Sequence, residues 1–229
     1  MIFEKYRLFL ERFQNKGYKY ILFNEFNSEK NSQLIIRHDI DLDIDLALDI
    51  AKIEHEIGAK STFFFLLRSE SYNLITNNNI EKLNKIKELG HQISIHFDLL
   101  LYNNVHAGLR EEIKLFKSFF NEKIDIISIH RPNHTFLKNS ENFFNIPTTY
   151  EKKFTNDNIA YYADSGGSFR YGNPVNSDDF KKNKNIQLLI HPIWWTLNEG
   201  SVNDCVEAVI KIKNNNMREH FKKNIKTFR

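Results

Sequence analysis

Two carboxylates at the end of an apolar run are the residues of this sequence best suited to chemistry. Asp39 and Asp41 follow the strand-like segment 33–37, and side chains two residues apart on an extended chain point to the same side. Carboxylates so close repel each other unless a cation neutralises them. The pair therefore predicts a divalent metal site, with one carboxylate as ligand and the other free as a base. The alternative, acidic capping of a following helix, accounts for Asp43 and Asp45 but not for Asp39.

A histidine occupies the same kind of position at the end of another apolar run. His96 closes the strand-like segment 92–97, and a neutral imidazole suits zinc or a similar divalent ion. Asp98 lies on the same face as His96 and is either a further ligand or a hydrogen-bond partner of one. His91 begins this segment at its far end, so we interpret it as a packing or turn residue.

Later segments add an arginine, two histidines and a pair of tryptophans. Arg131 ends an apolar run and can bind a carboxylate through two parallel hydrogen bonds, while its neighbour His130 could complete a metal shell. His191 ends the last apolar run and is a candidate general acid. Trp194 and Trp195 follow it, and they either stack on a sugar ring or belong to the core.

Short, fully apolar segments alternate with segments whose apolar residues recur at helical spacing. This alternation predicts a parallel sheet covered by helices, with a site at the carboxyl ends of the strands. Because so many strands carry a polar residue at that end, a curled sheet, a barrel of complete or incomplete closure, is favoured over a doubly wound one. No glycine-rich phosphate loop follows any strand. We expect helices at 3–14, 43–57, 79–89, 107–120 and 202–213, and strands at 33–37, 62–67, 92–97, 124–129 and 186–191.

The composition is that of an ordinary globular protein. The 229 residues, 41% of them hydrophobic, suffice for a substantial core and are expected to form one domain over 1–229. A net charge of +3 gives little support to a nucleic-acid partner, and we interpret the basic segment 211–229 as a solvated helix and tail. The single cysteine, Cys205, excludes an internal disulfide or a cysteine-rich zinc site and is expected in the core. Glu4 and Glu11 interrupt the first apolar segment, so we expect no leader peptide, no membrane span and a cytoplasmic location.

Taken in order, these segments resemble the motifs of the polysaccharide deacetylase family. The resemblance covers roughly residues 33–196 and implies the fold of that family, a deformed (β/α)-barrel of about seven parallel strands that is also called the NodB homology domain. The segments that carry it are Arg37-His-Asp-Ile-Asp41, Gly90-His-Gln-Ile-Ser-Ile-His96, Arg131-Pro132, Asp164 and Leu189-Ile-His191-Pro192.

The resemblance also implies a role for each matching residue. By this likeness Asp39 is the catalytic base, and Asp41 and His96 bind a divalent metal ion, which we expect to be zinc. Arg131 is expected to orient the base. His191 is expected to act as the general acid.

The sequence departs from the family in its metal ligands. The family pairs its second-motif histidine with another four residues later, and that position here is Leu100. The first motif also has an additional residue between its two acids. We therefore expect His130 to be the third ligand, with Asp98 as the alternative; a different metal preference, or no metal at all, is also compatible with the loss of the family's histidine.

These features predict a metal-dependent hydrolase that removes an acetyl group from an N-acetylated sugar or glycan precursor, such as a nucleotide-linked amino sugar. Its substrate is expected to contact Asp98, Asp164, Trp194 and Trp195. Two alternatives remain open. One is an amidohydrolase that acts on a small non-sugar amide at the same site, and the other is a non-catalytic barrel that binds a glycan or a protein partner.

Overall fold

The computed structural model describes residues 4–141, 143–155, 158–197 and 200–229. The strands within these residues are β1 (Lys19–Ile21), β2 (Gln33–Ile40), β3 (Thr62–Phe65), β4 (Gln92–Asp98), β5 (Ser128–His130), β6 (Ile159–Ala163) and β7 (Asn185–Ile190). The α-helices are α1 (Glu4–Asn15), α2 (Ile44–Glu56), α3 (Asn77–Glu88), α4 (Val105–Phe120), α5 (His134–Lys138), α6 (Lys152–Thr155), α7 (Asp178–Lys181), α8 (Ile193–Thr196) and α9 (Val202–Asn224).

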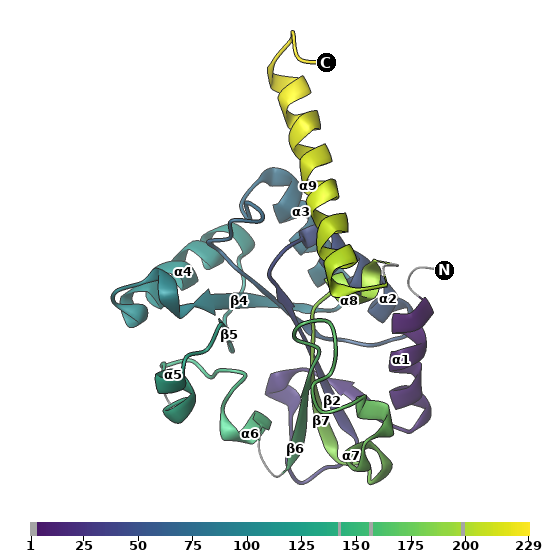
Figure 1. Ribbon diagram of the computed structural model, residues 1–229. Coiled ribbons are helices and arrows are strands. Elements are labelled where there is room, and N and C mark those ends of the chain that lie inside the picture. The colour runs from purple at the N-terminus through teal and green to yellow at the C-terminus, as the bar shows by residue number, and fades with distance from the viewer. Residues whose placement is uncertain (1–3, 142, 156–157, 198–199) are drawn as a thin grey trace.

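The strands form one parallel sheet in the order β5-β4-β3-β2-β7-β6, and β1 pairs with the first half of β2, before β3 begins. In Figure 1, β4 runs horizontally while β6 and β7 run roughly vertically, so the sheet curls strongly between β4 and β7. Among the described residues β5 and β6, at the two ends of this order, are not paired with each other. The predicted fold class, a deformed barrel of parallel strands, is therefore confirmed, with the barrel open between β5 and β6.

The central strand β2 is buried along its whole length and separates two environments. Leu34 and Ile36 face the large core beneath the surrounding helices. Ile35 faces the inside of the curled sheet, in a small cluster with aromatic and aliphatic residues of other segments. Because side chains alternate along a strand, Arg37 and Asp39 lie on the same inner face as Ile35. The inside of the half-barrel is thus apolar at one end and polar towards the carboxyl end of β2.

A buried carboxylate holds β2 from the helix side. Glu54 of α2 is fully buried, and it receives hydrogen bonds from Tyr6 (2.5 Å) and Ser61 (2.6 Å). His38 of β2 lies 2.8 Å from the same carboxylate, and His91 lies 3.5 Å from it. The prediction that His91 is a packing residue is confirmed, since it is buried and bridges Ser61 and the carbonyl of Ala51. Both oxygens of Glu54 therefore have partners.

Most expected elements are found close to their predicted bounds. The helix after β2 begins behind Asp43, whose side chain accepts the N–H groups of Asp45 (2.8 Å) and Leu46 (3.1 Å). The capping interpretation thus holds for Asp43. Two strands were not predicted: β1 has only three residues, and β6 is a half-buried edge strand whose apolar and polar faces do not alternate clearly. The strand expected at 124–129 is shorter and later, as β5.

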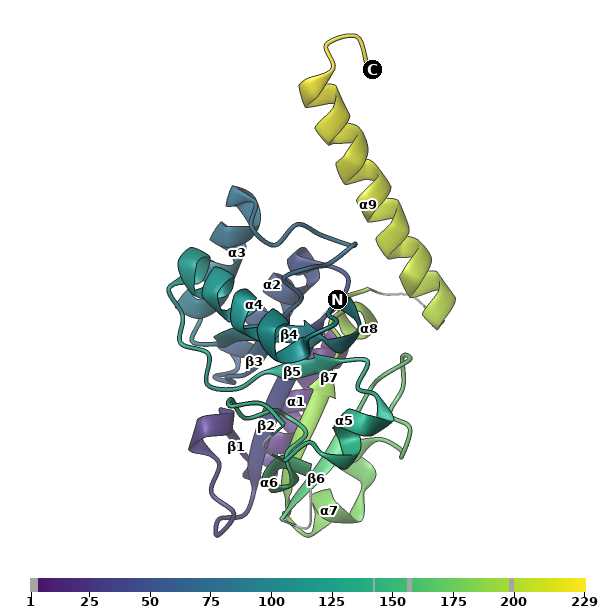
Figure 2. The same cartoon turned by 90° about the vertical axis from the view of Figure 1, so that its left-hand side faces the viewer.

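The last helix is longer than predicted and extends away from the body. Its first turns pack through Cys205 and Val209 against Leu46 and Ile193, which confirms the prediction of a buried Cys205. Figures 1 and 2 both show the later turns of α9 projecting beyond the other helices. Residues 214–229 are exposed, as the interpretation of a solvated helix and tail requires. No helix within the described residues combines the length and the apolar character needed to cross a bilayer.

Candidate metal centre and active site

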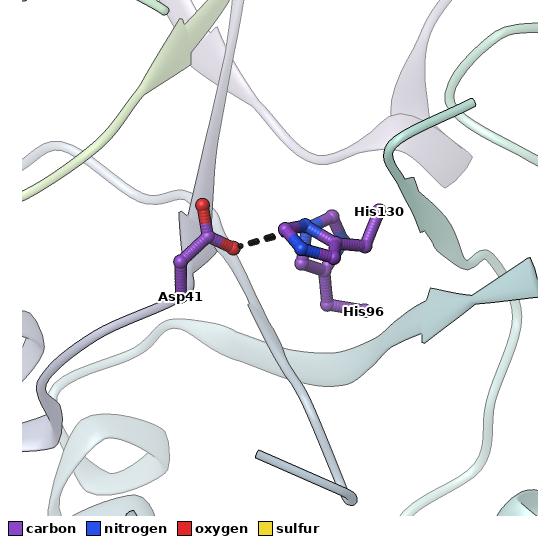
Figure 3. Close-up of side chains that lie close together, drawn as sticks. All are labelled: Asp41, His96 and His130. Carbon is purple, nitrogen blue, oxygen red and sulfur yellow. Dashed lines mark hydrogen bonds and ion pairs between the residues drawn. The ribbon is translucent and has the colours of Figure 1, made fainter. Parts of the chain in front are cut away.

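Three potential metal ligands converge where β2, β4 and β5 end. Oδ1 of Asp41 lies 3.2 Å from Nε2 of His96 and 3.4 Å from Nδ1 of His130, and these two nitrogens are 3.1 Å apart. The three ligand atoms all lie within 4.8 Å of one another. Figure 3 shows the two imidazole rings, from neighbouring strands, meeting the carboxylate from β2. The structure thus brings together the three residues expected as ligands.

The cluster has the character of an ion site rather than of a packed hydrogen-bond network. Oδ1 of Asp41 is buried and has no hydrogen-bond partner, and a buried anionic oxygen without a partner is costly unless a cation is present. One carboxylate and two imidazoles form a donor set that suits zinc and similar divalent ions. The residues present therefore fit a divalent metal ion.

Charges within the cluster shift its titration. Burial raises the pKa of Asp41, but the adjacent imidazole of His96, with those of His191 and His130, outweighs burial and brings that pKa below its usual range. Burial, together with the charge of His96, lowers the pKa of His130. Burial lowers the pKa of His96, but the charge of Asp39 and the contact with Asp41 outweigh burial and raise that pKa. Because a metal ion requires an ionised carboxylate and neutral imidazoles, its binding would release the proton of His96.

Asp39 lies beside this cluster and is almost completely buried. Its Oδ2 accepts hydrogen bonds from Nη2 of Arg37 (3.0 Å) and from Oγ of Ser128 (3.1 Å), while its Oδ1 has no partner. Nε2 of His96 is 3.8 Å from Oδ2 of Asp39. Burial raises the pKa of Asp39, but the charges of Arg37, His96 and His191 together outweigh burial, so this pKa is lowered. Asp39 is thus held ionised with one oxygen available.

Arg37 was not predicted as a site residue. It is fully buried inside the half-barrel, where its guanidinium contacts Thr149 and lies over the rings of Tyr150 (4.9 Å) and Tyr161 (5.8 Å). The sequence does carry a signal for it, because Arg37 precedes Asp39 by two residues on one strand and shares its face.

Arg131 does not meet the expectation that it contacts the base. Its guanidinium pairs with Asp98 and is 56% exposed, and the contacts of Asp39 are made by Arg37 and Ser128 instead. Asp98 is buried, with its other oxygen accepting the N–H of Leu100 (3.0 Å). Both oxygens of Asp98 are occupied, and it is not part of the ligand cluster.

His191 approaches the cluster from the end of β7. Its Nδ1 lies 2.6 Å from Asp164, and its Nε2 lies 3.8 Å from Oδ2 of Asp41. The indole N–H of Trp195 donates to the other oxygen of Asp164 (2.7 Å). Burial lowers the pKa of His191, but the hydrogen bond and charge of Asp164 outweigh burial and raise that pKa. Asp164 thus orients His191 so that Nε2 points to the cluster.

The two tryptophans lie in different surroundings. Trp194 lines a small pocket of about 60 Å³ together with Asp39, Asp41 and His191. Trp195 packs against Tyr6 and Phe9 of α1, with ring centroids 5.3 and 4.9 Å away. Trp194 therefore lies at the pocket. Trp195 belongs to the aromatic core, which is the second of the two interpretations of the tryptophan pair, and it reaches the site only through Asp164.

Comparisons with known proteins found similarity at the level of structure only. No family model and no curated protein matches the sequence. A family 4 carbohydrate esterase from Bacillus anthracis matches with a TM-score of 0.47 and 15% identity, over 93% of this chain and 86% of that one. A peptidoglycan deacetylase from Bacillus subtilis matches with a TM-score of 0.45 and 12% identity, over 83% of this chain and 87% of that one. A family 4 pseudoenzyme from Bacillus anthracis matches with a TM-score of 0.44 and 12% identity, over 80% of this chain and 60% of that one.

Proposed function

We propose that this chain is a divergent member of the polysaccharide deacetylase family and a metal-dependent hydrolase. Its reaction is removal of an acetyl group from an N-acetylated sugar or glycan precursor. The observation that carries the proposal is the convergence of Asp41, His96 and His130 within 4.8 Å beside Asp39, a buried carboxylate with one free oxygen. We further propose a single domain over residues 1–229 and a cytoplasmic location.

Asp41, His96 and His130 are the residues that would hold the metal ion, which we propose to be zinc. A bound divalent ion supplies electrophilic assistance to the amide carbonyl and acidifies water. His130 takes the place of the histidine that the family carries at the position of Leu100. Because His96 and His130 lie on adjacent strands, this replacement keeps two imidazoles in the ligand set without the helical turn that follows β4.

Asp39 acts as the general base. Its Oδ2 is held by Arg37 and Ser128, and these two donors leave Oδ1 free to accept a proton from water. The buried guanidinium of Arg37 keeps Asp39 ionised before the reaction and stabilises the surrounding charge throughout it. Arg37 thus takes the positioning role that the motif comparison gave to Arg131.

His191 acts as the general acid. Its contact with Asp164 fixes the proton on Nδ1, so Nε2 is the atom that faces the substrate. The raised pKa of His191 favours the protonated imidazole that can donate to a departing amine. Trp195 supports this arrangement through its hydrogen bond to Asp164.

Trp194 is the proposed sugar contact, since it lines the pocket that contains Asp39, Asp41 and His191. An indole face can stack on the apolar face of a sugar ring. Asp98 and Arg131 pair at the rim of the site, where the exposed guanidinium is available to a polar substituent of the substrate.

The test is amide hydrolysis by the zinc-loaded protein, measured as acetate released from N-acetylglucosamine oligomers and from a small non-sugar acetamide. We expect the sugar to be hydrolysed, with kcat reduced about 10²–10⁴-fold in Asp39→Asn and with zinc binding retained by that variant. Trp194→Ala should impair the sugar reaction and spare the small amide. Faster turnover of the small amide would favour the amidohydrolase alternative, and zinc binding with no turnover of either would favour a non-catalytic barrel.

A further inference from the structure

A groove of about 900 Å³ adjoins the active-site pocket, and Leu42 and Asp43 line both. The pocket itself measures only about 60 Å³. The remainder of any substrate whose carbonyl reaches Asp41 must therefore continue beyond the pocket. The groove begins at the pocket rim and runs between the segment before α3 and the face of α9.

One wall of the groove is polar and firmly anchored. The hydroxyl of Tyr72 donates to the carbonyl of Ile40 (2.6 Å) and accepts the N–H of Leu66 (2.9 Å), which ties this wall to the ends of β2 and β3. The side-chain amide of Asn79 donates to the carbonyl of Asn73 (2.8 Å) and closes the loop. This side is lined by amides and hydroxyls, which suit hydroxylated ligands, and by three charged side chains, of which Asp45 and Lys82 pair with each other: Ser71, Asn73, Thr76, Asn78, Asn79, Asp45, Glu70 and Lys82.

The opposite wall is an apolar stripe on α9. Val206, Ile210, Met217 and Phe221 line the groove, and Lys213, Asn216 and His220 of the same helix line it beside them. The spacing of the four apolar residues, by four, seven and four positions, keeps them on one face of the helix. Each is at least a third exposed: 36%, 44%, 53% and 43%. Such a stripe beside a catalytic pocket marks a surface that binds something apolar.

A charged contact fixes α9 at the pocket end of the groove. Nζ of Lys213 lies 2.5 Å from Asp43, which is buried and also caps α2. Because Asp43 borders the pocket as well as the groove, this ion pair sets the distance between the apolar stripe and the catalytic residues.

We propose that this groove binds an aliphatic chain carried by the substrate, so that the enzyme acts on an amphiphilic N-acetylated amino sugar. The inference rests on the proposed function. The sugar portion contacts the polar wall and the chain contacts the stripe on α9. The groove favours a ligand held between two walls over a flat bilayer surface, because α9 and the segment before α3 both line it. A helix of a second copy fits poorly, because the facing wall offers amides and hydroxyls instead of an apolar surface.

The first experiment compares the methyl and octyl β-glycosides of N-acetylglucosamine as substrates, with the octyl glycoside kept below its micelle concentration. We expect KM to be about tenfold or more lower for the octyl glycoside because its chain is buried on binding, with kcat unchanged. The double variant Ile210→Asp/Met217→Asp should remove that advantage. Leu115→Asp is the control, since Leu115 is an exposed apolar residue (48%) on α4, outside the groove. An equal KM for both glycosides in the wild type would overturn the inference and leave the proposed function intact.

The second experiment measures binding of octyl β-glucoside, which has no acetamido group, by calorimetry. Glucoside binding that is lost in the double variant and retained in Leu115→Asp supports the proposal that the groove binds an aliphatic chain. If such binding is found but no amide is hydrolysed, only the proposed function fails. No binding by the wild type overturns the inference. The inference is also overturned if the wild type binds no glucoside but sediments as a dimer and the double variant does not. The stripe would then be a contact between two copies of the chain.

Discussion

Two buried clusters of carboxylate and imidazole lie on opposite faces of β2, and they differ in how fully their polar atoms are satisfied. On the helix side, both oxygens of Glu54 are engaged by Tyr6, His38 and Ser61, and only Nδ1 of His38 lacks a partner. On the inner side, Oδ1 of Asp39, Oδ1 of Asp41 and Nδ1 of His96 are buried without hydrogen-bond partners. The same residue types therefore form one cluster whose polar atoms are almost all paired and one cluster in which several are not.

The difference supports separate proposed roles for the two clusters, one in the stability of the fold and one in the proposed reaction. A saturated buried network lowers the energy of one conformation and binds nothing further. Unsatisfied buried atoms cost free energy of folding, and such atoms are retained where a ligand or an ion satisfies them. We therefore propose that the Glu54 cluster stabilises the fold and that the Asp41 cluster binds the metal ion and takes part in catalysis.

The largest expected effect is on the inner cluster. Asp41→Asn removes the anionic ligand, and we expect activity to fall by about a thousandfold or more. Its side chain is 28% exposed, so the free energy of unfolding of the metal-free protein should change by less than about 1 kcal/mol. Denaturant unfolding and acetate release, measured on the same preparation, check both. A large loss of stability would mean that Asp41, like Glu54, serves to stabilise the fold.

Glu54→Gln should show the opposite pattern. Removing the charge that His38 and His91 face leaves a broken buried network, and we expect a loss of about 3 kcal/mol in the free energy of unfolding. The kcat of the folded fraction should stay within about threefold. Glu56→Gln is the matched control on the same helix, because Glu56 is exposed and its partner Arg7 is only half-buried. A Glu54 variant of normal stability and low kcat would contradict the division between the two clusters.

A third comparison separates the two arginines. Arg37→Lys keeps the charge but loses the planar contacts with Asp39 and the tyrosines, so we expect kcat to fall by about 10–100-fold. Arg131→Lys, at an exposed side chain that pairs with Asp98 and not with Asp39, should change kcat by less than about threefold. Steady-state kinetics at saturating substrate distinguishes them. The reverse order of effects would restore the role that the family motif assigned to Arg131.

The smallest effect concerns pH and the helix-side cluster. Burial lowers the pKa of His91 in the folded state, which therefore favours the neutral ring. The resulting stability is fully present above about pH 6.5, the pKa of a histidine in the unfolded chain. It is lost as the pH falls from there towards the lowered pKa of the folded state. We therefore expect the Tm of the wild type to fall more steeply between pH 7.5 and 5.5 than the Tm of His91→Phe. His220→Phe, at an exposed position of α9, should retain the wild-type slope. Equal slopes in all three proteins would remove His91 from the account.

The sequence predicted the architecture and the convergence of the site because both follow from periodicity and strand ends. Fully apolar strands that alternate with amphipathic helices leave few arrangements, and their carboxyl ends meet at one edge of the sheet. Because these three residues lie at such strand ends, their convergence could be predicted despite the departure from the family at Leu100: Asp41, His96 and His130. The sequence did not predict β1 or β6, because strands of three and five residues at the sheet edges carry too little pattern.

The partners of the site residues were harder to predict than the residues themselves. Arg131 was chosen from a motif of adjacent residues, whereas the contact of Arg37 with Asp39 depends on strand geometry that places them on one face. Trp195 reaches Asp164 only because α8 follows β7 directly and turns the indole back towards it. The extension of α9 beyond residue 213 carries only two further apolar residues of the stripe, Met217 and Phe221, among charged and amide side chains, and this sparse signal was not used to bound the helix.

The most direct test of the account is zinc stoichiometry and affinity, measured by elemental analysis and competitive titration on the wild type, His130→Ala and His91→Ala. We predict one zinc ion per chain in the wild type and in His91→Ala, with affinity at least about tenfold weaker in His130→Ala. Wild-type protein that binds no zinc, or zinc affinity that depends on His91 and not on His130, would contradict the assignment of the metal to the inner face of β2.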